Sequence, residues 1–444
     1  MGTRDYFPEL RRSALRVVDT EEPTRPGRRH FFRAVALHGA SIPVVHFALQ
    51  SSFGGEIGGG GPAPAKLPAS EPRSDKIIAD FSSPYLELVR RLREAAEVEQ
   101  ALMLQYLYAA FSLKPVYLPV IASCTPGSID LTGVAIQKMQ HLVTVNRLLV
   151  ALGVGPTLLQ EEFPYDLDVY PFECILEPLS HKSLAKYLYA EAPAALFAPD
   201  APVKDRRLAR KLMQVLGRNT HTNHLGGLYD AIIASLKDCA ASGLIEEFDI
   251  DVWLDRLHAV KVEGEDGHFN FFRSVFEGHH ESILGRTEAA HAAPHNAMSI
   301  VGHRNEIDSS ALPALSRLGD LHYWSVLLLL DLHFSEDGEK ERYLELARMQ
   351  MLGPVWSLAR HLPKLGGGMP FHPLSLRYTP RADTATNCLL AAEMLREAHV
   401  MAEKIGKALP ADYPIEMKAG VLHELEQMTR SSPRRAEARR MSAT

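Results

Sequence analysis

The chain has 444 residues, of which 46% are hydrophobic and 23% are charged, and its formal net charge is -6. These proportions are ordinary for a globular protein, and the length suffices for two or three domains with a large core. The negative net charge argues against a dedicated nucleic-acid surface. The four cysteines form no CxxC pair and so indicate neither a zinc site nor a disulfide framework.

Residues 1–80 are predicted to be an N-terminal tail that ends in a Gly/Pro-rich linker. Within it, Arg28-Arg29 and a bulky apolar pair precede the apolar run Ala34–Leu49, a pattern that resembles a twin-arginine export signal. The run is shorter than the about 20 residues that span a bilayer, so no stable membrane span is predicted. The alternative is a helix packed on the domain, which leaves localisation open between the cytoplasm and export.

The first long helix is predicted over Leu88–Lys114, after a cap and first-turn proline at Ser83-Pro84. One face of this helix is apolar at helical spacing, and the exception is Glu99. A carboxylate on a core-facing stripe is costly unless it is hydrogen-bonded, paired or bound to a cation. Glu99 is therefore expected to contact a hydrogen-bond donor, an opposite charge or a cation supplied by another part of the fold.

The second helix is predicted over Leu131–Leu152, and its apolar stripe is interrupted by Lys138 and His141. Residues 156–204 are rich in proline and lack periodicity. They are predicted to form a long crossover with one short helix near Leu184–Ala190.

The third helix is predicted over Lys204–Ser242, with His224 near its middle. The fourth is predicted over Val252–Glu277 and contains Gly264 and Gly267. Two glycines inside a helix cost roughly 1 kcal/mol each relative to alanine. The fourth helix is therefore expected either to break there or to need a close backbone approach.

The chain is predicted to be all-α, with a bundle over 81–278, a linker over 279–308, a C-terminal helical unit over 309–430 and a basic tail over 431–444. The predicted helices of the C-terminal unit are Leu312–Phe334, Lys340–His361, Ala382–Leu409 and Pro414–Met428.

Four polar residues on the bundle helices suggest a metal site. Glu99 lies on the first helix, His141 on the second, and Glu265 and His268 form a Glu-x-x-His pair on the fourth. Carboxylate-bridged metal sites in four-helix bundles use Glu residues and Glu-x-x-His pairs that point inward. The four residues in this order along the helices favour a metal centre, although each alone is more typical of a hydrogen-bonded core residue.

Four segments resemble the ferritin-like domain of the iminophenyl-pyruvate dimer synthase family, whose named enzymes couple amino-acid-derived imines in bis-indole pigment pathways. The similar segments are Val98–Ala109, Ile136–Gly153, Leu225–Ile232 and Val262–Phe269, and the resemblance extends over about 80–370. It implies a ferritin-like four-helix bundle with a long crossover, followed by C-terminal helices. It also implies non-haem iron and a small amine, imine or amino-acid-derived substrate.

The chain departs from the family pattern at the implied site. Lys138 stands where the second helix of the family carries the Glu of Glu-x-x-His, and Gly227 stands where the third helix carries a Glu. Gln100 follows Glu99 where the family usually has His. Both lost ligands are carboxylates, so a standard di-iron site is in doubt.

Two interpretations of the site remain open. In the first, the site is rebuilt, and Glu99, His141, His224, Glu265 and His268 bind one Fe(II), Mn(II) or Zn(II) ion, with Glu263 in reserve. In the second, the Lys138 ammonium neutralises Glu99 or Glu265 in place of the metal. A third alternative for Lys138 is that its side chain extends to solvent along the helix.

The sequence thus predicts a metal-dependent oxidoreductase of secondary metabolism, with iron or manganese and a small-molecule substrate. The alternative is a metal-free ferritin-like bundle with a binding or structural role, so the sequence leaves open whether the protein is an enzyme. It also leaves open whether the chain forms a homo-oligomer.

Overall fold

The computed structural model describes residues 79–117, 130–158, 172, 174–217, 225–245, 249–278, 290–297, 311–335, 340–373, 384–414 and 423. Within these residues the regular structure is helical, and the one β feature is an isolated antiparallel bridge between Leu113 and Ala290. The predicted all-α fold is therefore confirmed. Three predicted features lie outside the described residues: the apolar run Ala34–Leu49, the basic tail, and all of Pro414–Met428 except Pro414 and His423.

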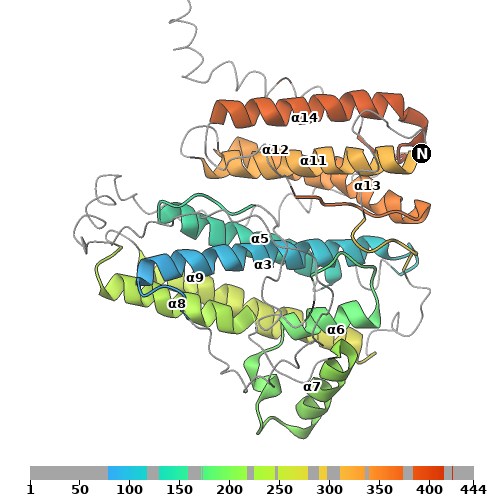
Figure 1. Cartoon of the computed structure of the whole chain (residues 1–444). Helices are drawn as coiled ribbons and strands as arrows, with labels where there is room; N and C mark the ends of the chain where they lie inside the picture. Colours follow the sequence, from blue (N-terminus) through green and yellow to red (C-terminus); the bar gives the residue numbers. More distant parts are fainter. Residues whose placement is uncertain are drawn as a thin grey trace, which may run out of the picture.

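The helices of the bundle region are α3 (Pro84–Ser112), α5 (Leu131–Ala151), α6 (His181–Ala190), α7 (Val203–Leu216), α8 (Leu225–Ala241), α9 (Ile250–Val262), the π-helical η2 (Glu263–His268) and α10 (Phe269–Phe276). Helix α3 packs against α5 and α8, and α9 packs against α8 and α5 (Figure 1). Helices α3, α5, α8 and α9 thus form one bundle. The crossover from α5 to α8 carries α6, the 3-10 turn η1 (Ala194–Phe197) and α7.

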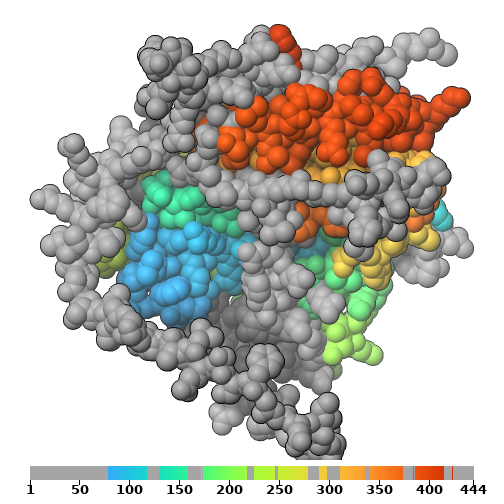
Figure 2. All heavy atoms as spheres, turned by 45° about the horizontal axis from the view of Figure 1, so that its top comes forward, coloured from blue at the N-terminus to red at the C-terminus, as the bar shows by residue number. Residues whose placement is uncertain are grey.

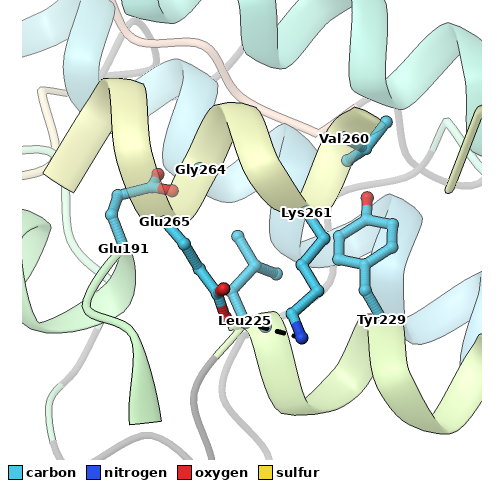
Figure 3. A pocket seen from close by; sticks show the side chains of 8 residues that line it. Glu191, Leu225, Tyr229, Val260, Lys261, Gly264 and Glu265 are labelled. Atoms are coloured by element: carbon cyan, nitrogen blue, oxygen red, sulfur yellow. Dashed lines mark ion pairs between the residues drawn. The ribbon is translucent and has the colours of Figure 1, made fainter. Parts of the chain in front are cut away.

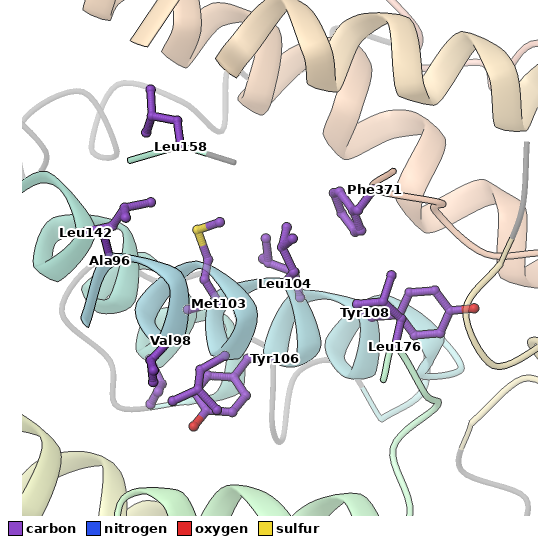
Figure 4. Close-up of a cluster of buried hydrophobic side chains, with 14 of the residues drawn as sticks. Ala96, Val98, Met103, Leu104, Tyr106, Tyr108, Leu142, Leu158, Leu176 and Phe371 are labelled. Atoms are coloured by element: carbon purple, nitrogen blue, oxygen red, sulfur yellow. The ribbon is translucent and has the colours of Figure 1, made fainter. Parts of the chain in front are cut away.

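Helix α3 begins as its sequence predicts and is buried along most of its length. The side chain of Ser83 accepts a hydrogen bond from the backbone N–H of Leu86, and Pro84 occupies the first turn. Side chains of α3 project to two opposite sides (Figure 4). Met103 lies on the side of Phe371 from the C-terminal unit, and Tyr106 points the other way. Helix α3 therefore belongs to two packing interfaces at once.

The predicted third helix, Lys204–Ser242, is wrong as a single element. Helix α7 ends at Gly217, which has a φ of 68° and whose N–H bonds back to Met213 and Gln214. Glycine adopts this left-handed conformation without the steric cost of a Cβ and so commonly ends helices. The next described helix, α8, begins at Leu225.

The predicted fourth helix is continuous, but its middle is a π-helix. The π-helical segment η2 contains both Gly264 and Gly267 and joins α9 to α10. A π-helical turn takes about one residue more than an α-helical turn. Side chains three apart within η2 therefore do not share a face as they would in an α-helix.

The C-terminal helices form a layer over the bundle (Figure 1). They are α11 (Ala311–Phe334), α12 (Lys340–Gln350), the π-helical η3 (Met351–Val355), α13 (Trp356–His361), α14 (Thr384–Lys404) and the 3-10 turns η4 (Leu362–Leu365) and η5 (Gly406–Ala408). Helix α11 packs against α12 and α14, and α13 contacts α3. Figure 2 shows α14, in orange-red, on the same face of the molecule as the blue start of α3. None of the described helices is both long and apolar enough to span a bilayer.

Candidate functional site

A buried lysine stands at the centre of the polar residues in the bundle. The Nζ atom of Lys138 lies 3.2 Å from Oε2 of Glu99 and 2.9 Å from Oε1 of Glu191. All three side chains are fully buried. We call Glu99, Lys138, His141, Glu191 and His268 the Lys138 cluster. The alternative in which Lys138 extends to solvent is therefore wrong.

Each of the two histidines contacts one of the buried carboxylates. His141 places Nδ1 3.5 Å from Oε2 of Glu99 and Nε2 2.9 Å from Oε2 of Glu263. His268 places Nδ1 3.3 Å from Oε2 of Glu191, and the two imidazole rings stack with centroids 5.6 Å apart. The expected convergence of Glu99, His141 and His268 in the interior of the bundle is observed.

Glu191 is a member of the cluster that the sequence did not reveal. It is the C-cap residue of the short crossover helix α6, and it lies in a segment without hydrophobic periodicity. The Tyr106 hydroxyl donates a 2.7 Å hydrogen bond to Oε1 of Glu191, and the Tyr229 hydroxyl donates a 2.8 Å hydrogen bond to Oε1 of Glu99. Each buried carboxylate is thus held by a tyrosine as well as by the ammonium.

The electrostatics favour the charged forms of Lys138 and of both carboxylates. Burial alone would lower the pKa of Lys138, but Glu191 and Glu99 outweigh it and raise that pKa. Burial would raise the pKa values of Glu99 and Glu191, but Lys138 and the histidines hold both values below their usual range. The Lys138 side chain is therefore a cation and does not supply the free amine that a nucleophile requires.

The histidines have opposite pKa shifts. Burial lowers the pKa of a histidine, but the charge of Glu99 and the hydrogen bond with Glu263 raise that of His141. Burial lowers the pKa of His268, and the charge of Glu191 offsets it only in part. The pKa of His141 is therefore raised and that of His268 is lowered, so His268 loses its proton at a lower pH than His141.

One predicted site residue, Glu265, does not join the cluster, and another, His224, is not among the described residues. Glu265 is half-buried, and its Oε1 lies 3.9 Å from Nζ of Lys261, beside Gly226 of α8 (Figure 3). The π-helical geometry of η2 directs Glu265 away from the face that carries His268. His224 lies outside the described residues. Gly227 has no side chain and supplies no ligand, and a Cβ at this position would meet no atom within 4 Å.

Three atoms at the centre of the cluster have no hydrogen bond among the described residues: Oε2 of Glu99, Nζ of Lys138 and Nδ1 of His141. Nζ of Lys138 and Nδ1 of His141 lie 3.2 Å and 3.5 Å from Oε2 of Glu99, but the angles at these atoms are not those of hydrogen bonds. Beside the cluster, Glu191, Gly226 and Gly264 line a small cavity of about 10 Å³ between η2 and α8 (Figure 3). This volume is close to that of one water molecule.

The residues present do not fit a carboxylate-bridged metal centre. Such a centre takes its carboxylates from the four bundle helices, and its dications need negative or neutral ligands. Here the ammonium of Lys138 contacts Glu99 and Glu191, which would otherwise bind the cation. Within the described part of the chain, no group of three or more His, Cys, Asp and Glu side chains is arranged to hold a metal ion.

Residues 92–275 match the family model described as ferritin-like. The matched segment runs from α3 to α10 and so contains the four bundle helices and the Lys138 cluster. The chain therefore carries a ferritin-like domain, as its sequence predicted.

Two curated relatives confirm the resemblance to dimer synthases. Over 215 residues the chain is 29% identical to the 2-imino-3-(indol-3-yl)propanoate dimerase of Chromobacterium violaceum, a match that covers 41% of this chain and 21% of that enzyme. Over 153 residues it is 32% identical to the dichlorochromopyrrolate synthase of Lentzea aerocolonigenes, with 29% and 15% covered. Each match thus covers only a minor part of the relative's length.

Among solved structures, a ferritin-like protein from Caulobacter vibrioides matches with a TM-score of 0.41 and 16% sequence identity. The match covers 66% of this chain and 98% of that one.

Proposed function

We propose that this protein is a metal-free ferritin-like bundle with a binding role in secondary metabolism, and that its ligand is a small amine-, imine- or amino-acid-derived molecule. One observation supports the metal-free part of the proposal above all others. The cation that balances Glu99 and Glu191 is the ammonium of Lys138. A buried ion pair of this kind leaves neither carboxylate free for a metal ion.

The proposed ligand class comes from the relatives. One is named as a dimerase of an indolyl imino acid, and the other as a synthase of dichlorochromopyrrolate. The longer match covers 41% of this chain. A bundle that has lost the metal-binding carboxylates can still bind a molecule related to the substrate of such an enzyme.

The second candidate is a metal-dependent oxidoreductase that acts on the same class of small molecule, with non-haem iron or manganese. It is supported by the three central atoms without hydrogen bonds, Oε2 of Glu99, Nζ of Lys138 and Nδ1 of His141. Buried polar atoms without a hydrogen bond are rare in folded proteins, and a bound ion is one of the explanations for them. In this candidate a metal would have to displace the ammonium of Lys138.

Elemental analysis separates the two candidates. The full chain is expressed in medium supplemented with Fe(II) and Mn(II), purified without a chelator and analysed for metals. A ferritin-like protein with an intact carboxylate-bridged site is treated in the same way as a control. The proposal predicts far less than one metal ion per chain and an unchanged melting temperature after EDTA. Stoichiometric iron or manganese would favour the oxidoreductase instead.

A further inference from the structure

We propose that the ammonium of Lys138 occupies the position of a divalent cation and that Glu191, from the crossover helix, supplies the second carboxylate of the site, since α8 contributes none. A single substitution that removes the positive charge of Lys138 should then turn the cluster into a divalent-cation site. This inference rests on the proposed metal-free function, because it explains which residues took over the role of the metal and of its missing ligand.

The donors around Lys138 come from several parts of the bundle. Glu99 belongs to α3, His141 to α5, Glu191 to the end of α6 and His268 to η2. Two carboxylates and two imidazoles are a ligand set that suits Fe(II), Mn(II), Co(II) or Zn(II). A point charge already lies between the two carboxylates of this set, and that charge is the Lys138 ammonium, 3.2 Å from Glu99 and 2.9 Å from Glu191.

Glu191 is held in place as a metal-binding carboxylate would be. Its Oε1 accepts from the Tyr106 hydroxyl at 2.7 Å, and its Oε2 lies 3.3 Å from Nδ1 of His268. The backbone of η2 also makes room for it, because a Cβ at Gly264 would lie 3.1 Å from Oε2 of Glu191. Gly264 is thus the close backbone approach that two glycines in the fourth helix suggested. Outer contacts of this kind orient metal-binding carboxylates.

Glu99 and His141 bring two further donor atoms close together. Oε2 of Glu99 and Nδ1 of His141 lack hydrogen bonds among the described residues; they lie 3.5 Å apart, and Oε2 of Glu99 lies 3.2 Å from Nζ of Lys138. Nε2 of His141 lies 2.9 Å from Oε2 of Glu263. The tautomer that donates Nε2–H to Glu263 leaves the Nδ1 lone pair free for a cation.

A small cavity lies beside the cluster. It is lined by Glu191, Gly226 and Gly264, and also by Glu265 and Lys261 (Figure 3). Its volume of about 10 Å³ is close to that of one water molecule.

The test uses the full-length chain with Lys138→Glu, and Co(II) alone as the probe, because bound Co(II) has a visible absorption spectrum. After EDTA treatment and removal of the chelator, each protein is titrated with Co(II) and followed by absorption, calorimetry and melting temperature. We expect Lys138→Glu to bind about one Co(II) per chain and to melt several degrees higher when the site is saturated. The native chain should show neither the spectrum nor the shift.

Two controls localise the effect. Lys237→Glu makes the same charge change at an exposed position of α8 and should give no Co(II) spectrum. Adding Glu191→Gln to Lys138→Glu removes the proposed carboxylate and should weaken Co(II) binding by at least about tenfold. Equal affinity with and without Glu191→Gln would overturn the role assigned to Glu191.

Lys138→Glu places a third carboxylate beside Glu99 and Glu191, and their repulsion can unfold the protein. Its Co(II) titration is therefore interpreted only if circular dichroism shows that the variant is folded. If it is unfolded without metal and Co(II) does not restore its circular dichroism, Lys138→Gln decides. This variant removes the ammonium without adding charge and should bind Co(II) more weakly than Lys138→Glu but measurably. If Lys138→Gln is folded and also shows no Co(II) binding, the inference is wrong, whereas the proposed function stands. If the native chain binds Co(II) with the same spectrum, the proposed function fails first.

Discussion

Nζ of Lys138 lies 2.9 Å from Oε1 of Glu191, and both side chains are buried. Lys138 comes from the middle of α5, and Glu191 caps the short crossover helix α6. Their ion pair therefore connects the crossover to the bundle core. Removing one partner of such a pair lowers the free energy of unfolding by far more than the intact pair contributes to it, because the other charge stays buried without compensation.

Tyr106→Phe should be more destabilising than Tyr187→Phe. The two rings touch, with centroids 4.7 Å apart, and both are fully buried. The Tyr106 hydroxyl donates to the charged Glu191, whereas the Tyr187 hydroxyl donates to the backbone carbonyl of Gln105 at 3.2 Å. Hydrogen bonds to charged groups contribute about 1.5–3 kcal/mol and neutral ones about 0.5–1.5 kcal/mol. Urea unfolding measures both losses, and equal losses would mean that the charge of Glu191 is not held by Tyr106.

Glu87 should contribute to stability at neutral pH and lose that contribution in acid. Burial alone would raise its pKa, but hydrogen bonds and the charges of Arg90 and Arg91 lower it to about 2. A carboxylate whose folded-state pKa is depressed contributes stability above its unfolded pKa of about 4.5, and that stability is lost as the pH falls toward about 2.

The Glu87 prediction is tested with Glu87→Gln. The native protein should exceed this variant by about 1–3 kcal/mol in free energy of unfolding at pH 7, and the difference should vanish between about pH 4.5 and 2. Glu94→Gln is the control, because burial raises the pKa of Glu94 and Arg90 offsets this only in part. For this variant the sign is opposite: the native protein should gain stability relative to Glu94→Gln as the pH falls, because protonation removes a carboxylate charge that burial disfavours. A pH-independent difference for Glu87→Gln would show that Glu87 acts by packing.

Gly368→Ala should destabilise the contact between the bundle and the C-terminal unit. A Cβ at Gly368 would overlap the ring of Tyr108, whose hydroxyl also donates to the backbone carbonyl of Pro294. Overpacking of a rigid ring costs about 1–3 kcal/mol. Gly227→Ala is the matched control, since a Cβ there meets nothing within 4 Å and alanine favours the helix by up to about 1 kcal/mol. Thermal unfolding should therefore show shifts of opposite sign, and two increases would contradict the packing.

Much of the fold was predictable because local periodicity determines it. The four bundle helices bury apolar stripes, and Glu99 and Lys138 were recognisable as polar exceptions on those stripes. Their burial follows from the neighbouring residues, which share the same face. Two polar residues on different core-facing stripes of one bundle are expected to meet, and they do at 3.2 Å.

The rest of the site depends on contacts that periodicity does not encode. Glu191 follows a helix of ten residues in the crossover, and only the tertiary packing of α6 brings it to Lys138. Glu265 was placed beside His268 because α-helical spacing aligns residues three apart. The π-helical η2 removes that alignment, and the signal for it was the pair Gly264 and Gly267 inside a helix.

Residues 1–65 should contribute little to the stability of the helical units. Their composition predicts a tail and linker, and the described bundle begins with the cap at Ser83. Deleting them should leave the thermal midpoint of the chain nearly unchanged. A deletion of 1–117, which also removes α3, should abolish the cooperative transition. A large drop for the shorter deletion would mean that Ala34–Leu49 packs on the domain.

The Lys138 ammonium, which contacts both Glu99 and Glu191, is the cation that neutralises them. The most direct measurement is the free energy of unfolding of Lys138→Met in urea with EDTA present. Methionine keeps most of the volume of the lysine side chain and removes the charge, so we expect a loss of about 3–5 kcal/mol. Lys261→Met is the control, because its ion pair with the largely exposed Asp230 should cost less than about 1 kcal/mol. If Lys138→Met is as mild as Lys261→Met, some other charge neutralises the two carboxylates and the account is wrong.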